Sequence, residues 1–172
     1  MRIRSVTLSA ALAVALAAAL LGSGAALADT GRGTKSYTFG EPGKAAEATR
    51  TVEVAADDRG GMRYSMDLGS IRQGETIRFV VTNKGAGPHE FTIGDTASQR
   101  AHARLMAKNP EMHHDDDPSA VTLRPGETKE LVWRFSKPVQ GELVFACQMP
   151  GHYDAGMVHK AKLDKAGKAK TS

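Results

Sequence analysis

The strongest constraint on the fold is a series of short runs in which apolar residues recur at every second position. In "ETIRFVVTN", for example, the odd positions from Ile77 to Val81 are apolar. Side chains of a β-strand point alternately to its two faces, so such runs, bounded by Gly, Pro or Asn, predict strands. Further runs are "TRTVEVAA", "MRYSMDL", "ELVWRF", "GELVFAC" and "MVHKAKL". We count seven or eight strands and no βαβ alternation, which predicts an all-β protein, an antiparallel sandwich or small barrel.

One segment, "DTASQRAHARLMAKNP", has helical rather than strand character. Thr96, with Gln99 three residues later, fits a capping box, and Asn109-Pro110 predicts the end of the helix. The polar loop "EMHHDDDPSA" follows. We therefore expect residues 95–120 to form a helical insertion between two strands.

The N-terminus has the features of an export signal. Arg2 and Arg4 precede an uncharged stretch over residues 5–28, which ends in the small-x-small sequence Ala26-Leu27-Ala28. We predict a cleaved signal peptide over residues 1–28 and a protein in the periplasm. The alternative is a retained anchor, because the stretch is long enough to span a bilayer. Its glycines and cleavage site favour removal.

The remaining chain is long enough for one domain with a real core. We expect a flexible segment over residues 29–47, a folded domain over 48–164 and a basic tail over 165–172. Without the two N-terminal arginines, 21 basic side chains face 19 acidic ones. This weak balance gives no argument for nucleic acid as a partner. We expect a monomer that has no membrane contact after cleavage.

The stretch "CQMPGHYDAGM" contains Cys147, the only cysteine of the chain. A single cysteine cannot form a disulfide within the chain, which leaves an intermolecular bridge, a reactive thiol or a metal ligand. His152 and Met157 follow in the same loop, and His89 stands upstream in "GPHEF". Two imidazoles and a thiolate with a weak thioether define a type 1 copper site. The residue types therefore favour the metal-ligand reading.

Each of these residues also has a simpler interpretation. Cys147 could be a small buried hydrophobe, His89 a histidine at a strand edge, and Met157 part of the core. Met149 is a rival axial donor, although its place inside the cysteine–histidine turn favours a position on the surface around the metal. The four residues in this order are more specific than any one of them.

With these residues the chain resembles the cupredoxins, the plastocyanin and azurin superfamily. The resemblance covers residues 49–164 and implies a Greek-key β-sandwich with one type 1 copper. The implied copper ligands are His89, Cys147, His152 and Met157. The family carries single electrons between transient redox partner proteins, so we expect no enzyme activity. The insertion resembles that of periplasmic cupredoxins associated with copper tolerance in bacteria.

One position departs from the family pattern. Many cupredoxins have Asn after the upstream histidine, where it braces the ligand loop, and this chain has Glu90. The difference leaves the rigidity of the loop and the redox potential open.

The insertion also carries soft ligands of its own. His102 and Met106 lie four residues apart and share a helix face with Leu105, so a stripe packed on the sandwich is one interpretation. The other is a second Cu(I) site, formed by His102, Met106, Met112, His113 and His114. It supports an alternative function, copper capture or buffering without a redox partner. A copper oxidase or nitrite reductase would need further copper centres, and the chain has no His-x-His pair for them.

Overall fold

The structure is a computed structural model, and it describes residues 36–112 and 116–166. The predicted signal peptide, His113, His114 and most of the basic tail lie outside the described residues. No helix within the described ranges is both long enough and apolar enough to cross a membrane.

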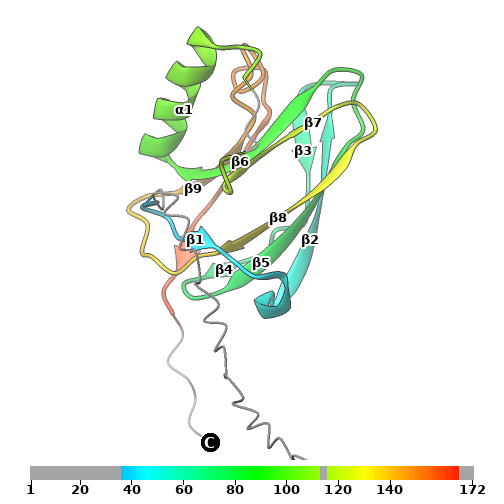
Figure 1. Ribbon diagram of the computed structural model, residues 1–172. Helices are drawn as coiled ribbons and strands as arrows, with labels where there is room; N and C mark the ends of the chain where they lie inside the picture. Colours follow the sequence, from blue (N-terminus) through cyan, green and yellow to red (C-terminus); the bar gives the residue numbers. More distant parts are fainter. Residues whose placement is uncertain (1–35, 113–115, 167–172) are drawn as a thin grey trace, which may run out of the picture. The chain divides into compact units, whose positions relative to one another are not determined.

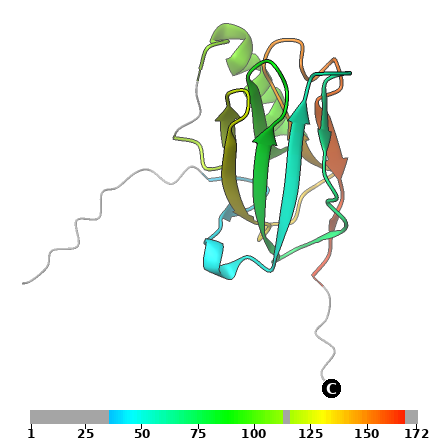
Figure 2. The same cartoon turned by 90° about the vertical axis from the view of Figure 1, so that its right-hand side faces the viewer.

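The larger sheet has five strands, and its longer ones lie side by side in Figure 2. Its order is β1 (Glu41–Pro42), β8 (Thr128–Arg134), β5 (Thr76–Asn83), β2 (Arg50–Asp57) and β3 (Arg63–Ser65). The pair β2–β5 is parallel, whereas the other pairs of this sheet are antiparallel. The expected antiparallel pairing is therefore wrong for β2–β5.

The smaller sheet is antiparallel and carries the residues of the predicted metal site. Its order is β10 (Val158–Ala161), β9 (Leu143–Ala146), β6 (His89–Asp95) and β7 (Ala120–Leu123). Two short strands, β4 (Ile71–Arg72) and β11 (Leu163–Asp164), form a separate parallel pair. The fold is thus a Greek-key β-sandwich, as predicted, with very short strands in addition to the seven or eight expected.

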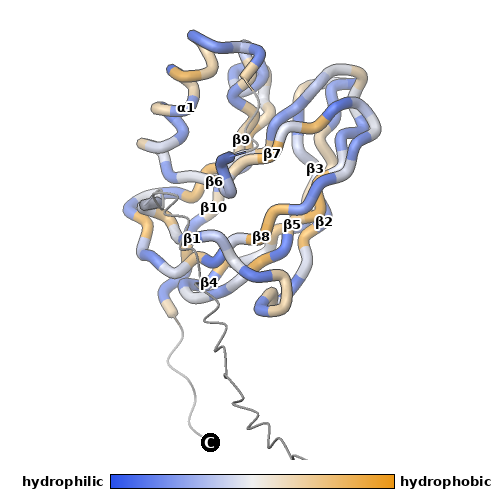
Figure 3. The backbone as a smooth tube through the Cα atoms, viewed as in Figure 1, coloured by the Kyte–Doolittle hydropathy of each residue, from blue (hydrophilic) through white to orange (hydrophobic). Residues whose placement is uncertain are grey.

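The core lies between the two sheets and contains most of the large apolar side chains. Every second residue of β5 from Ile77 to Val81 is fully buried, which confirms the alternation read from the sequence. Hydrophobic residues also recur along β2 and β8 (Figure 3). Phe79, Phe91 and Phe145 pack on one another with ring centroids 5.4 to 5.8 Å apart. Burial of these side chains supplies the main driving force for joining the sheets.

The insertion is a single helix, α1 (Thr96–Lys108), which contacts β6 and β9 on the side away from the larger sheet (Figure 1). Its N-cap is Asp95, whose side chain accepts from the Ser98 backbone N–H in a capping box. The predicted box of Thr96 and Gln99 is therefore displaced by one residue. Asn109 caps the other end, as expected.

The segment before β2 differs from the expectation of a flexible lead-in. Phe39 is 2% exposed and stacks on Trp133 with ring centroids 5.1 Å apart. The short strand β1 then pairs with β8, and a 3-10 turn, η1 (Ala45–Glu47), leads to β2. Residues 36–47 are therefore part of the folded domain, which begins before residue 48.

Candidate metal centre

The ligand loop runs from the end of β9 to the start of β10 and folds back on itself. The Cys147 N–H donates to the Met157 carbonyl over 3.1 Å, and the Met157 N–H donates to the His152 carbonyl over 2.9 Å. A tighter turn inside the loop has the His152 N–H donating to the Met149 carbonyl over 3.0 Å. Gly151 has φ +85°, which L side chains rarely adopt, and so permits this turn. The backbone thereby brings Cys147, His152 and Met157 to one end of the sandwich.

The upstream histidine reaches the loop because β6 lies beside β9 in the smaller sheet. His89 begins β6 and is fully buried. The backbone N–H of the next residue, Glu90, donates to the Cys147 Sγ over 3.4 Å. Strand pairing therefore places an imidazole next to a thiol that lies far away in the sequence.

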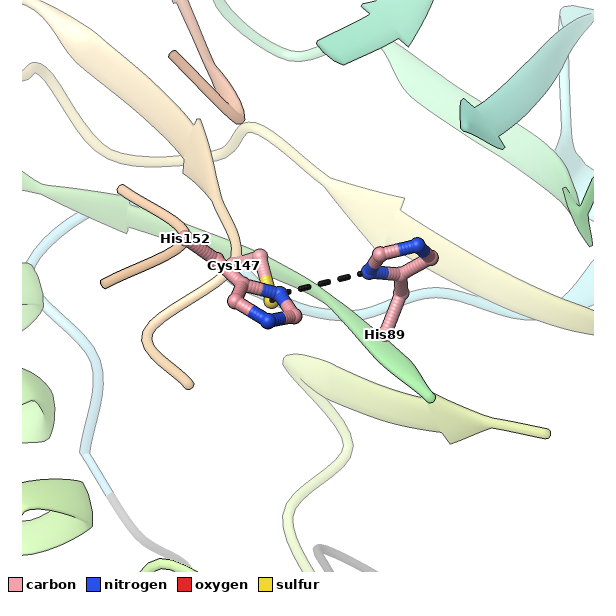
Figure 4. A group of neighbouring side chains, drawn as sticks. All are labelled: His89, Cys147 and His152. Carbon is pink, nitrogen blue, oxygen red and sulfur yellow. Dashed lines mark hydrogen bonds between the residues drawn. The ribbon is translucent and has the colours of Figure 1, made fainter. Parts of the chain in front are cut away.

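Three side chains converge at this point, as Figure 4 shows. The His152 Nδ1 lies 3.3 Å from the Cys147 Sγ and 3.3 Å from the His89 Nδ1. All three donor atoms lie within 4.8 Å of one another. In residues 36–112 and 116–166, no other group of three or more His, Cys, Asp or Glu side chains is gathered in this way. Two imidazoles and a thiol fit copper well.

The predicted fourth ligand lies in the same small cluster. Met157 is fully buried and packs with Cys147 and Ala56. Met149 and Met62 pack against this cluster from partly buried positions. Met149, which we expected at the surface around the metal, is partly buried. Met157 remains our prediction for the axial donor.

The surroundings of the three donors favour their uncharged forms. Burial raises the pKa of the Cys147 thiol to about 12, and the nearby Glu90 carboxylate adds to the rise. Burial lowers the pKa of His89 and of His152, and for His89 the neighbouring His152 lowers it further. Neutral imidazoles have a free lone pair for a metal at neutral pH. The thiol, in contrast, must lose its proton when a metal binds.

Asp58 is a neighbour of the candidate site that the sequence does not reveal. Its Oδ2 lies 3.4 Å from the His89 Nε2, on the far side of the ring from Nδ1. The backbone N–H groups of Ala86 and Gly87 donate to its two oxygens over 2.8 and 2.9 Å. A carboxylate on the second nitrogen of a ligating histidine fixes the ring and its tautomer. Nothing in "AADDRGG" marks Asp58 for this role before its position in space is known.

Glu90 stands where many cupredoxins have an Asn, and like that Asn it braces the ligand loop. It is fully buried, and its Oε2 accepts from the Gln148 N–H over 3.1 Å. Its backbone N–H donates to Cys147, as described above. One residue therefore holds both the thiol and the residue that follows it.

The structure gives the proposed second Cu(I) site little support. Met106 is fully buried in the face of α1 that packs on the sandwich, whereas Leu105 is 43% exposed and does not share that face. The His102 Nε2 lies 3.5 Å from the Glu90 Oε2 and so points toward the first site. Met112 is half-buried, and His113 and His114 lie outside the described residues. The packing interpretation accounts for Met106.

Comparison with known proteins identifies the family. A family model described as copper binding proteins of the plastocyanin/azurin family matches residues 50–164. The chain belongs to this family. Copper is accordingly its cofactor, in agreement with the donor set above. The fold is similar to that of auracyanin B, with a TM-score of 0.50 and 23% identity over 72% of this chain and 95% of that one.

Curated relatives are nearer in sequence. The chain is 48% identical over 122 residues to a copper-resistant cuproprotein, CopI, of Rubrivivax gelatinosus, with 71% of each chain covered. It is 35% identical over 148 residues to the CopI protein of Pseudomonas aeruginosa, which covers 70% of this chain and 79% of that one. Within the family the chain thus resembles copper-resistance proteins.

Proposed function

We propose that the chain is an exported, periplasmic protein with one type 1 copper, which transfers single electrons and serves copper tolerance. The observation that carries this proposal is the convergence of His89, Cys147 and His152, with Met157 buried beside them. Bound copper would supply a one-electron couple that this set of soft and intermediate donors can stabilise in both oxidation states.

The position of the site supports transfer of electrons rather than chemistry on a substrate. His89 and Cys147 are fully buried, and His152 is the ligand that reaches the surface. Around it lie Met149, Pro150 and Tyr153, a small patch suited to brief contacts with redox partner proteins. With four protein ligands, no position is left for a substrate, so we propose that the chain is not an enzyme.

The role in copper tolerance is supported by the similarity to the CopI proteins, whose names record copper resistance. Electron transfer and a role in copper tolerance are compatible, since an electron carrier can exchange electrons with other copper-handling proteins. The second candidate is capture or buffering of copper with a second Cu(I) site and no redox partner. The number of copper ions per chain separates it from the electron carrier with one copper.

The test is metal analysis with a visible absorption spectrum on the purified protein and on Cys147→Ser. We expect one copper per chain and an intense thiolate-to-copper charge-transfer band in the wild type. Cys147→Ser removes the thiolate and should abolish the band. Leu105→Ala is the control and should keep the band, because Leu105 is 43% exposed and does not belong to the cluster around Cys147. A wild type that binds copper without such a band would overturn the type 1 assignment. Two coppers per chain would favour the buffering candidate.

A further inference from the structure

Helix α1 is joined to the ligand loop by buried polar side chains. Gln99 is 5% exposed and Gln148 is 7% exposed, although both side chains are polar. The Gln148 Nε2 donates to the Gln99 Oε1 over 2.9 Å, between residues 49 positions apart. Gln148 directly follows Cys147, so this bond connects the insertion to the residue next to the thiol.

Gln99 is itself held in place from the other side. Its Nε2 donates to the Thr92 Oγ1 over 2.9 Å and to the Val144 carbonyl over 3.1 Å. These partners lie on β6 and β9, the two strands that carry His89 and lead into Cys147. A buried amide with its hydrogen bonds made is fixed in one orientation, because turning it would leave polar groups without partners. Gln99 therefore presents its oxygen to Gln148 from a rigid support.

A second connection runs through Glu90. Its Oε2 accepts from the Gln148 backbone N–H over 3.1 Å and lies 3.5 Å from the His102 Nε2 of α1. Gln148 is thus held at its backbone by Glu90 and at its side chain by Gln99. Both of these residues contact α1 or belong to it, so the helix supports the loop at two points.

We propose that α1 is an outer brace that fixes the Cys147–His152 turn before copper binds, with Gln99 as the positioning residue. The proposal rests on the copper role of this turn given above and assigns the insertion a part in it. Without the brace, Cys147 and His152 would have to be ordered when the metal arrives, at a cost in affinity. Partners outside the ligand set commonly change metal affinity by about 10-fold to 100-fold when they are removed.

The test compares Gln99→Met with two control variants. Methionine keeps the length of the side chain and a good helix propensity but makes none of the three hydrogen bonds. Arg104→Ala changes an exposed residue of the same helix. Ile77→Val removes one methylene from the core beneath the larger sheet and controls for a general loss of stability.

Two measurements are made on each protein. The first is hydrogen exchange of the Gln148 backbone N–H in the metal-free protein, which needs no copper. We expect exchange about tenfold faster in Gln99→Met, because Gln148 is no longer held from the helix side. The second is the copper dissociation constant, which we expect to rise about tenfold in Gln99→Met, with a changed charge-transfer band. Both controls should keep the wild-type band and affinity.

The outcomes separate the brace from the function on which it rests. Unchanged Gln148 exchange and unchanged copper affinity in Gln99→Met would overturn the brace and leave the copper site standing. An equal loss of affinity in Ile77→Val would also overturn it, since stability alone would then explain the effect. Faster exchange in Gln99→Met, with a wild type that forms no type 1 band, would support the brace and overturn the proposed function.

Discussion

Asp58 lies outside the predicted ligand set but next to one of its members, His89. The backbone N–H groups of Ala86 and Gly87 lower the pKa of Asp58, so its carboxylate stays ionised at neutral pH. It faces the Nε2 of the buried His89, which leaves Nδ1 for the metal. A charged acceptor at this place fixes both the orientation and the tautomer of the ring.

Replacing Asp58 should therefore weaken copper binding without removing a ligand. In Asp58→Asn the charge is lost, and one of the two backbone N–H groups loses its acceptor. We expect the copper dissociation constant to rise about tenfold, measured by competition with a chelator. Asp57→Asn is the matched control, because the Asp57 carboxylate is hydrogen-bonded to Arg59 and raises the pKa of His89 less than Asp58 does. Equal effects of the two substitutions would contradict the positioning role.

At the scale of the elements, the segment before β2 is the clearest addition to the predicted domain. Its composition, rich in Gly, Ala and Lys, masks two aromatic residues, Tyr37 and Phe39, which pack on Trp133. Tyr37 also donates to the Asp117 Oδ1 over 2.9 Å, and this bond ties the segment to the loop after α1. A few large side chains are enough to anchor a segment whose average composition suggests flexibility.

Phe39→Ala tests whether this anchor contributes to stability. Removing a fully packed phenylalanine leaves a cavity beside Trp133, so we expect the free energy of unfolding to fall by about 3 kcal/mol. Urea unfolding followed by Trp133 fluorescence measures the loss. Glu41→Ala, an exposed change in the same segment, should stay within about 0.5 kcal/mol of the wild type. A Phe39→Ala midpoint equal to that of the wild type would show that the segment adds nothing to the folded domain.

The elements that the sequence predicts well are those whose signal is local. The strands follow from the alternation of apolar and polar residues within each short run, and the end of α1 follows from Asn109-Pro110. The predicted start of α1 is one residue off, because Asp95 with Ser98 and Thr96 with Gln99 both fit a capping box. The parallel pairing of β2 with β5 could not be foreseen, since parallel and antiparallel strands can share one alternation pattern.

For the molecule as a whole, the candidate site divides in the same way. The loop residues Cys147, His152 and Met157 are close in sequence, and their types predict copper. The residues that hold them come from distant parts of the chain. Nothing in the sequence distinguishes such an aspartate or glutamine from the others. Asp58 and Gln99 become recognisable only when the fold places them beside His89 and Gln148.

The buried donors also make the stability of the whole metal-free protein depend on pH at both ends. The pKa values of His89 and His152 are lowered in the folded state, so below about pH 6.5 the unfolded chain binds more protons and stability falls as the pH drops. The pKa of Cys147 is raised to about 12, so above about pH 9 the unfolded thiol ionises first and stability falls as the pH rises.

Urea unfolding of the metal-free protein between pH 5 and 10 tests this behaviour, with Cys147→Ser as the matched variant. The alkaline fall should approach about 1.4 kcal/mol per pH unit from the thiol, and Cys147→Ser should lose that part while keeping the acid fall. Saturating copper should deepen the acid fall, because protons and metal compete for the same imidazole nitrogens. Identical alkaline slopes in the two proteins would show that burial does not raise the pKa of the Cys147 thiol.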